Sequence, residues 1–97
     1  MLKSAFMQPA KYRFIIGARL LQTEEGLKTS QVTKNYPAYR AGLKVGDIIL
    51  MADTTPVTDA NSFSNYLTDR GGTTQLIVKR SGNIRYINVN SVPVELQ

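Results

Sequence analysis

Apolar and polar residues alternate along much of the chain in short segments, and this period of two predicts strands. Residues 23–26, Thr-Glu-Glu-Gly, are turn residues that would join two such segments into a hairpin. Residues 81–83, Ser-Gly-Asn, would form a second hairpin turn. Pro56 and Val57 predict a short edge piece. The main predicted strands cover residues 11–16, 18–21, 27–33, 47–52, 73–80 and 84–92.

Two segments carry helix signals instead. Pro37 suits the first turn of a short helix over residues 37–41, and Gly42 can adopt the left-handed conformation that follows a helix end. A longer helix over residues 60–70 is predicted by side chains that recur at spacings of three and four, and two glycines would end it. Its recurring residues are Phe63, Tyr66, Leu67 and Arg70. The predicted fold is therefore mostly β with two helices, in the α+β class.

Length and composition limit the chain to one compact domain. Its 97 residues, 42% of them hydrophobic, allow a single core, because a chain this short buries only about 60–65% of its unfolded surface. We place the domain at residues 11–92, with residues 1–10 as a flanking arm and 93–97 as a loose tail. No apolar run reaches the roughly 18 residues of a membrane span or resembles a signal peptide. We expect a soluble chain without direct membrane insertion, cut from a longer secreted or membrane-tethered protein.

The charge balance is basic but dispersed. Twelve Lys and Arg against seven Asp and Glu give a net charge of +5, which can attract nucleic acid, anionic lipid or acidic peptides. No basic block is longer than two residues, which favours a solvated surface. Lys11-Tyr12-Arg13-Phe14 interleaves basic and aromatic residues, so a small basic nucleic-acid-binding domain is a remote alternative. No nucleic-acid partner is expected.

The residues for common catalytic chemistry are missing. Without histidine or cysteine the chain cannot assemble the usual acyl-transfer triads, a disulfide or a thiolate metal site. Its carboxylates are not spaced as a metal cluster, and Gly71-Gly72 follows a predicted helix instead of opening one, so no phosphate loop is present. We expect no enzymatic activity in this chain, no cofactor and no metal.

Residues 36–50, Tyr-Pro-Ala-Tyr-Arg-Ala-Gly-Leu-Lys-Val-Gly-Asp-Ile-Ile-Leu, form the most specific motif. The segment resembles the PDZ-domain pattern of Ser-Pro-Ala, two variable residues, Ala-Gly-Leu, two more, then Gly-Asp and an apolar strand. Together with Pro56-Val57 and the turn at residues 80–83, the resemblance covers residues 11–89 and is closest to PDZ domains of bacterial HtrA-type and other envelope proteases. It implies a five- to six-stranded, partly open barrel or sandwich, capped by one short and one longer helix. One departure is residues 51–55, Met-Ala-Asp-Thr-Thr, where the family's turn glycine is missing.

The resemblance also implies a site for a peptide carboxylate. In PDZ domains, backbone N–H groups of an apolar-apolar-Gly-apolar loop hold the ligand's terminal carboxylate, and Ile15-Ile16-Gly17-Ala18 matches that loop. Glycine suits such a loop because successive N–H groups can turn inward to form an anion-binding nest. A basic residue separated from the loop by three residues often attracts the carboxylate in this family. Lys11 occupies that place, with Arg13 as the alternative.

The implied function is a protein–protein interaction module that takes up a C-terminal or extended peptide as an extra strand. The peptide would lie along Ala18, Arg19, Leu20 and Leu21, with Ala60, Ser64 and Leu67 of the longer helix as the opposite wall; a one-residue shift would substitute Asn61. An apolar last ligand residue is expected, and the absence of histidine excludes the family's His-based preference for Ser or Thr.

The wider role follows from the same resemblance. The module would be a regulatory or substrate-recognition part of a larger bacterial protease or envelope protein, with the periplasm favoured as its location. The alternative is a structural or oligomer-forming domain whose groove is filled by its own or a neighbour's segment, including self-association through the tail.

Overall fold

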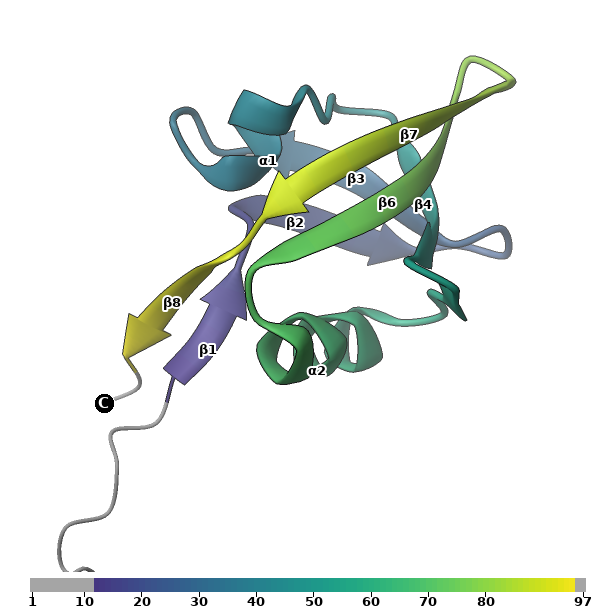
Figure 1. The fold of residues 1–97 in the computed structure, drawn as a ribbon. Helices are drawn as coiled ribbons and strands as arrows, with labels where there is room; N and C mark the ends of the chain where they lie inside the picture. Colours follow the sequence, from purple (N-terminus) through teal and green to yellow (C-terminus); the bar gives the residue numbers. More distant parts are fainter. Residues whose placement is uncertain (1–11, 96–97) are drawn as a thin grey trace, which may run out of the picture.

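The computed structural model describes residues 12–95. It contains eight strands and two helices within that range (Figure 1). The elements follow one another as β1 (Tyr12–Ile15), β2 (Ala18–Gln22), β3 (Leu27–Val32), α1 (Pro37–Ala41), β4 (Ile48–Ala52), β5 (Thr55–Pro56), α2 (Ala60–Arg70), β6 (Thr73–Arg80), β7 (Asn83–Asn90) and β8 (Val92–Glu95).

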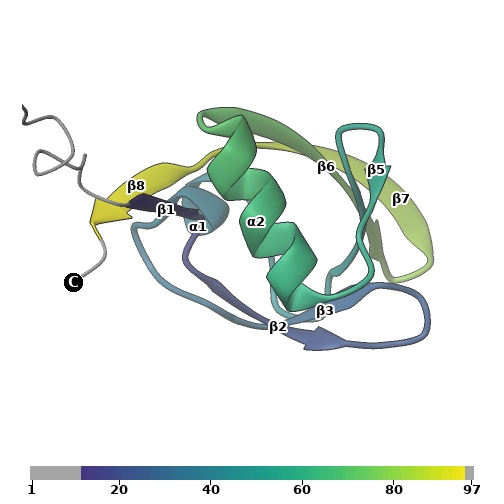
Figure 2. The same cartoon turned by 90° about the horizontal axis from the view of Figure 1, so that it is seen from below.

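The strands form two antiparallel sheets. The larger has the order β2-β3-β4-β6-β7, with β5 paired to β4, and the smaller contains β1 and β8. The helix α2 lies over the curved larger sheet between β2 and β6 (Figure 2). The short helix α1 packs against β7. The prediction of a mostly β, partly open fold with one short and one longer helix is confirmed, since the larger sheet does not close on itself.

The core lies between the larger sheet and the helices. Alternate residues of β6 are buried, as the period-two pattern predicts for a strand with one face on a core. Phe63 and Leu67 place the apolar face of α2 on this core. The fully buried aliphatic side chains are Leu27, Ile49, Leu76, Val78 and Val89.

Both predicted helices begin and end where their capping residues stand. Pro37 occupies the first turn of α1, and Gly42 follows its end with φ 94°. In α2 the Asp59 side chain accepts a hydrogen bond from the Ser62 N–H, which satisfies one of the unpaired donors of the first turn. These local signals explain why the two helix ranges agree with the sequence prediction.

Asp47 is a buried carboxylate that ties three parts of the fold together. Its side-chain oxygens accept hydrogen bonds from Arg80 Nε at 2.7 Å, Arg80 Nη2 at 2.6 Å and the Lys44 N–H at 2.9 Å. Arg80 Nη2 also donates to the Gly42 carbonyl at the end of α1. Burial by itself would raise the pKa of Asp47, but the hydrogen bonds from Arg80 and Lys44 outweigh it and hold that pKa below its usual value.

The turn between β4 and β5 forms without the family's glycine. Asp53 takes the left-handed conformation, with φ 53°, which aspartate tolerates better than most residues. Its N–H donates to the Gln75 carbonyl, and its side chain accepts from the Gln75 N–H at 3.0 Å. The missing glycine therefore changes the residue at the turn and not the hairpin.

The expectation of a loose tail from Pro93 is wrong for the described part of that segment. Val92–Glu95 is strand β8, and it pairs along its whole length with β1, from Ile15↔Val92 to Tyr12↔Glu95. The single strand predicted over residues 84–92 ends at Asn90, because Ser91 is buried and its N–H and hydroxyl both bond the Gly72 carbonyl. This anchor turns the chain out of the larger sheet, so β8 meets β1.

Candidate functional site

A groove with a volume of about 530 Å³ lies between α2 and the segment that runs from β1 into β2. Apolar side chains from both walls form most of its surface, and the polar groups lie on its walls and rim. The lining residues are Arg13, Phe14, Ile15, Ile16, Gly17, Ala18, Arg19, Leu20, Thr33, Tyr36, Ala60, Asn61, Phe63, Ser64 and Leu67.

Two hydrogen bonds orient the backbone of the loop at residues 15–18, which lines the groove. The Ile16 carbonyl accepts from the Ala38 N–H in α1, and the Gly17 carbonyl accepts from the Thr33 N–H, both at 2.8 Å. In a trans peptide the C=O and the following N–H point in opposite directions. The N–H groups of Gly17 and Ala18 therefore point away from α1 and Thr33, which is the arrangement of donors that a bound carboxylate requires.

Gly17 is required at this loop for two separate reasons. Its φ is 78°, in the left-handed region that side chains disfavour. A Cβ atom at this position would lie 2.2 Å from Tyr36 Cβ and 2.5 Å from Tyr36 Cγ. The glycine thus allows both the turn of the backbone and the close approach of the segment before α1.

The strand that follows the loop has an open edge. β2 stands at the end of the larger sheet, with β3 as its paired neighbour among the described strands. An edge strand presents backbone N–H and C=O groups that can pair with another strand. Ala18 and Leu20 line the groove, whereas Leu21 is 58% exposed and does not line it. The groove therefore joins a loop with two N–H groups turned away from the domain's own acceptors to a free strand edge and an apolar floor.

The strand β1 connects the loop to the helical wall. The Phe14 N–H donates to Thr68 Oγ1 at 3.1 Å, and Arg13 Nη1 donates to Ser64 Oγ. The Phe14 ring lies against Gly71 at the end of α2. These contacts hold α2 at a fixed distance from the loop, so β1 sets the width of the groove at this end.

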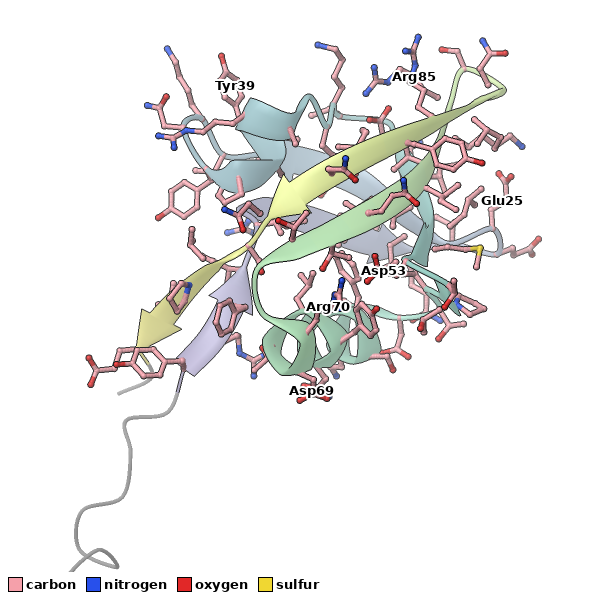
Figure 3. The ribbon with its side chains drawn as sticks, in the orientation of Figure 1. Glu25, Tyr39, Asp53, Asp69, Arg70 and Arg85 are labelled. Carbon is pink, nitrogen blue, oxygen red and sulfur yellow. The ribbon has the colours of Figure 1, made fainter. Side chains whose placement is uncertain are left out.

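The opposite side of α2 is fixed by Asp53. The Tyr66 hydroxyl donates to Asp53 Oδ2, and Arg70 Nε lies 3.3 Å from the same oxygen; Figure 3 shows Asp53 and Arg70 side by side. The hydrogen bond from Tyr66, supported by that from the Gln75 N–H, lowers the pKa of Asp53, and the same bond raises the pKa of Tyr66. The helix is thus attached on one side to β1 and on the other to the β4–β5 turn.

Nine of the eleven predicted site residues lie together at the groove: Ile15, Ile16, Gly17, Ala18, Arg19, Leu20, Ala60, Ser64 and Leu67. Leu21 lies outside it, and Lys11 lies outside the described residues. Arg13, the alternative basic residue, lines the groove. Both Ala60 and Asn61 do so as well, which accommodates either proposed register of the helix.

Sequence reasoning missed four residues of the lining. Phe14 and Phe63 are apolar residues of predicted elements, and Phe63 both belongs to the core and lines the groove. Thr33 and Tyr36 come from the segment before α1, and no local pattern marks them as groove residues. The contacts of Thr33 and Tyr36 with Gly17, which is distant from them in sequence, place that segment at the site.

Residues 12–95 contain neither a metal-binding cluster nor a membrane-spanning helix. No cluster of three or more acidic side chains capable of holding a metal ion occurs there. Neither described helix has the length and apolar character needed to cross a membrane.

The fold and the groove agree with a known family. Residues 15–91 match the family profile described as PDZ domain. The chain belongs to the PDZ family. This match covers the loop, the α2 wall of the groove and all of the larger sheet, and PDZ domains are non-catalytic modules. A search of curated proteins gave no match.

Solved PDZ-containing structures share the architecture. The HtrA3 PDZ domain bound to a phage-derived ligand, FGRWV, superposes with a TM-score of 0.78 at 20% identity, over 90% of this PDZ chain and 92% of that one. The HtrA-type protease AlgW with decapeptide gives 0.77 at 22% identity, over 86% of this chain and 30% of AlgW. The serine endoprotease from Yersinia pestis superposes with a TM-score of 0.72 at 28% identity, over 89% of this chain and 30% of the endoprotease. This PDZ chain thus spans about a third of the length of these two proteases.

Proposed function

We propose that this PDZ domain binds the C-terminal end of a partner polypeptide by adding it as a strand to the free edge of β2. The observation that carries the proposal is the orientation of the Gly17 and Ala18 N–H groups beside that edge. A terminal carboxylate fits these donors, and the next residues can pair with the β2 backbone. The HtrA3 PDZ domain and AlgW, which share this fold, are bound to peptides.

The apolar floor supports an apolar last ligand residue. Ile16 and Leu67 are almost fully buried beside the loop, and Ala18 and Leu20 continue the surface along β2. Burying a side chain such as Val or Leu contributes about 1.5–3 kcal/mol. With the main-chain hydrogen bonds, we expect micromolar binding, on the order of −8 kcal/mol.

Arg13 is the basic residue that we assign to the carboxylate end. It lies two residues before the loop, lines the groove and is held by its hydrogen bond to Ser64. Its positive charge stabilises a carboxylate nearby without occupying the N–H groups of the loop. Lys11, which the family pattern favoured, keeps this role as a prediction from sequence.

The fold of the neighbours supports a place in a larger protein. AlgW and the Yersinia enzyme are proteases of which this PDZ chain spans about a third, so we propose a regulatory or substrate-recognition module of an HtrA-like bacterial protein. The periplasm as its location follows from the resemblance to envelope proteases.

Binding of free and amidated peptides tests the proposal. A library of peptides with free C-termini, which includes FGRWV as a first probe, should yield micromolar hits with apolar last residues, and amidation should abolish each of them. Amidation is a cleaner control than a Gly17 substitution, because any side chain there would collide with Tyr36 and alter the fold. Hits that bind equally after amidation would refute the carboxylate mechanism, and the absence of hits would favour a groove filled by a segment of the protein itself.

A further inference from the structure

The geometry of the groove specifies which ligand residue faces which side chain of β2, provided that the proposed function holds. With the carboxylate on the N–H groups of Gly17 and Ala18, an antiparallel ligand places its last residue beside Ala18 and its penultimate residue beside Arg19. Residues directly opposite each other in a sheet share a face, and successive residues alternate between faces. Ala18 and Leu20 face the floor of the groove, so alternation directs the Arg19 side chain away from that floor, at the exposed rim. The penultimate ligand side chain then lies on this outer face, beside Arg19.

That outer face is positively charged. Arg19 is exposed, and its cross-strand partner on β3 is the neutral Gln31. Lys28, also exposed, lies opposite Leu21 further along the same face. Neither β2 nor β3 contains an aspartate or glutamate. A ligand strand added here would therefore bring its penultimate side chain next to a cation and no carboxylate.

The ion pairs of the described residues leave Arg19 without an acidic partner. They join Arg70 to Asp53, Lys79 to Glu25 and Arg80 to Asp47. Glu24 and Glu25 stand in the turn after β2, at the far end of the strand from Arg19. The groove itself is lined by Arg13 and Arg19 and by no acidic residue.

We propose that Arg19 selects ligands whose penultimate residue is acidic. The guanidinium can donate two parallel hydrogen bonds to a carboxylate, which a neutral amide accepts less strongly. Because the pair is exposed to water, the gain is modest: we expect about two- to fivefold tighter binding for Glu than for Gln. A lysine at the same place adds repulsion, so the ratio of Glu to Lys should be on the order of tenfold at low salt.

Three peptides that differ only at the penultimate residue test the proposal. All three end in the same apolar residue with a free carboxylate, and the residue before this last one is Glu, Gln or Lys. Their binding to the unaltered protein and to the Arg19→Glu and Arg40→Gln variants is measured by fluorescence anisotropy. Arg40 lies on α1 in a separate pocket with Asn88, so its variant also lowers the positive charge of the domain, at a distance from the ligand. Circular dichroism confirms that each variant is folded.

The expected result is a preference of Glu over Gln over Lys in the unaltered protein and in Arg40→Gln, and the reverse order in Arg19→Glu. An unchanged order in Arg19→Glu, or equal affinities in the unaltered protein, would overturn the role of Arg19. If the three peptides bind and amidation abolishes binding, the proposed function stands even when this selection fails. If none of them binds in any variant, both proposals fail together.

Discussion

Replacing Arg80 with methionine tests how the buried Asp47 carboxylate is tolerated. Asp47 is 1% exposed and accepts two hydrogen bonds from Arg80. Arg80→Met keeps a long side chain at this place but leaves the carboxylate with one donor, the Lys44 N–H. Arg80 also donates a hydrogen bond to the Gly42 carbonyl at the end of α1. Because α1 in turn supports the loop at residues 15–18 through Ala38, the Arg80–Asp47 pair underlies both the fold and the groove.

The expected loss of unfolding free energy can be bounded from two sides. Removing one partner of a buried ion pair costs about 3–5 kcal/mol. The electrostatic part of the cost is limited, because the Asp47 carboxyl can take up a proton instead of staying charged. At pH 7 that protonation costs about 4 kcal/mol, because pH 7 lies about three units above the usual Asp pKa and each unit corresponds to about 1.4 kcal/mol. Since Arg80 is still 22% exposed, we expect a loss of about 3 kcal/mol.

Urea unfolding followed by far-UV circular dichroism measures this loss at several pH values. In the unaltered protein the pKa of Asp47 is lowered, so the pair stabilises the fold above the usual Asp pKa of about 3.9, and this stability is lost as pH falls through the folded-state pKa. In Arg80→Met, burial without the partner raises that pKa, so protonation becomes cheap at low pH. The difference between the two proteins should therefore be largest at pH 7 and shrink towards pH 4.

Arg85→Met is the matched control. Arg85 acts on Asp47 through charge alone, without a hydrogen bond, and it lies on the outer part of β7 (Figure 3). Its loss should change the unfolding free energy by less than about 0.5 kcal/mol. A cost below about 1 kcal/mol for Arg80→Met, or one that is the same at pH 4 and pH 7, would show that the buried carboxylate does not depend on its partner as argued.

Three further predictions concern other parts of the fold. The hydroxyls of Thr29 and Thr74 are buried and find no hydrogen-bond partner within residues 12–95, so Thr→Val at either position should raise the urea midpoint or leave it unchanged; a loss of more than about 1 kcal/mol would reveal a hidden partner. Thr68→Val removes the acceptor of the β1 amide and should weaken peptide binding a few-fold in titrations, whereas Thr68→Ser, which keeps the hydroxyl, should bind normally. Gly17→Ala should lower the thermal midpoint, and a second substitution, Tyr36→Ala, should not restore it because Tyr36 Cβ itself is in the way. A restored midpoint would contradict the expected 2.2 Å distance between an added Cβ at Gly17 and Tyr36 Cβ.

Local signals predicted the helices and most strands, since each depends on residues close together in the chain. Pro37, Gly42 and the glycines after Arg70 set helix boundaries through their own backbone preferences. The β8 strand escaped prediction because its partner β1 is some eighty positions away and because Pro93 resembles a strand breaker. Proline is tolerated there because β8 is an edge strand of a two-stranded sheet.

In the groove, too, local motifs were predictable and contacts between residues distant in sequence were not. Ile16, Gly17 and Ala18 could be found from sequence because one short motif carries the loop. Leu21 was placed at the peptide strand as part of a continuous segment, but alternation turns it to the outer face, where it is exposed. The support of the loop by Tyr36 depends on a contact that no periodicity encodes. The assignment of these residues to a ligand stays a prediction until binding is measured.

The pairing of β1 with β8 has a mechanical consequence. Because Tyr12 stands opposite Glu95, the two ends of the described chain leave the domain at one pole, side by side (Figure 1). A force that separates these ends acts on the antiparallel pairs one after another, as in opening a zipper, and does not shear them all at once. We expect the β1–β8 sheet to open at low tension in an optical-tweezers experiment while the larger sheet stays folded. Its opening would break the hydrogen bond from the Phe14 N–H to Thr68 on α2. Pulling the two ends apart should then lower the affinity of the domain for the proposed peptide ligand.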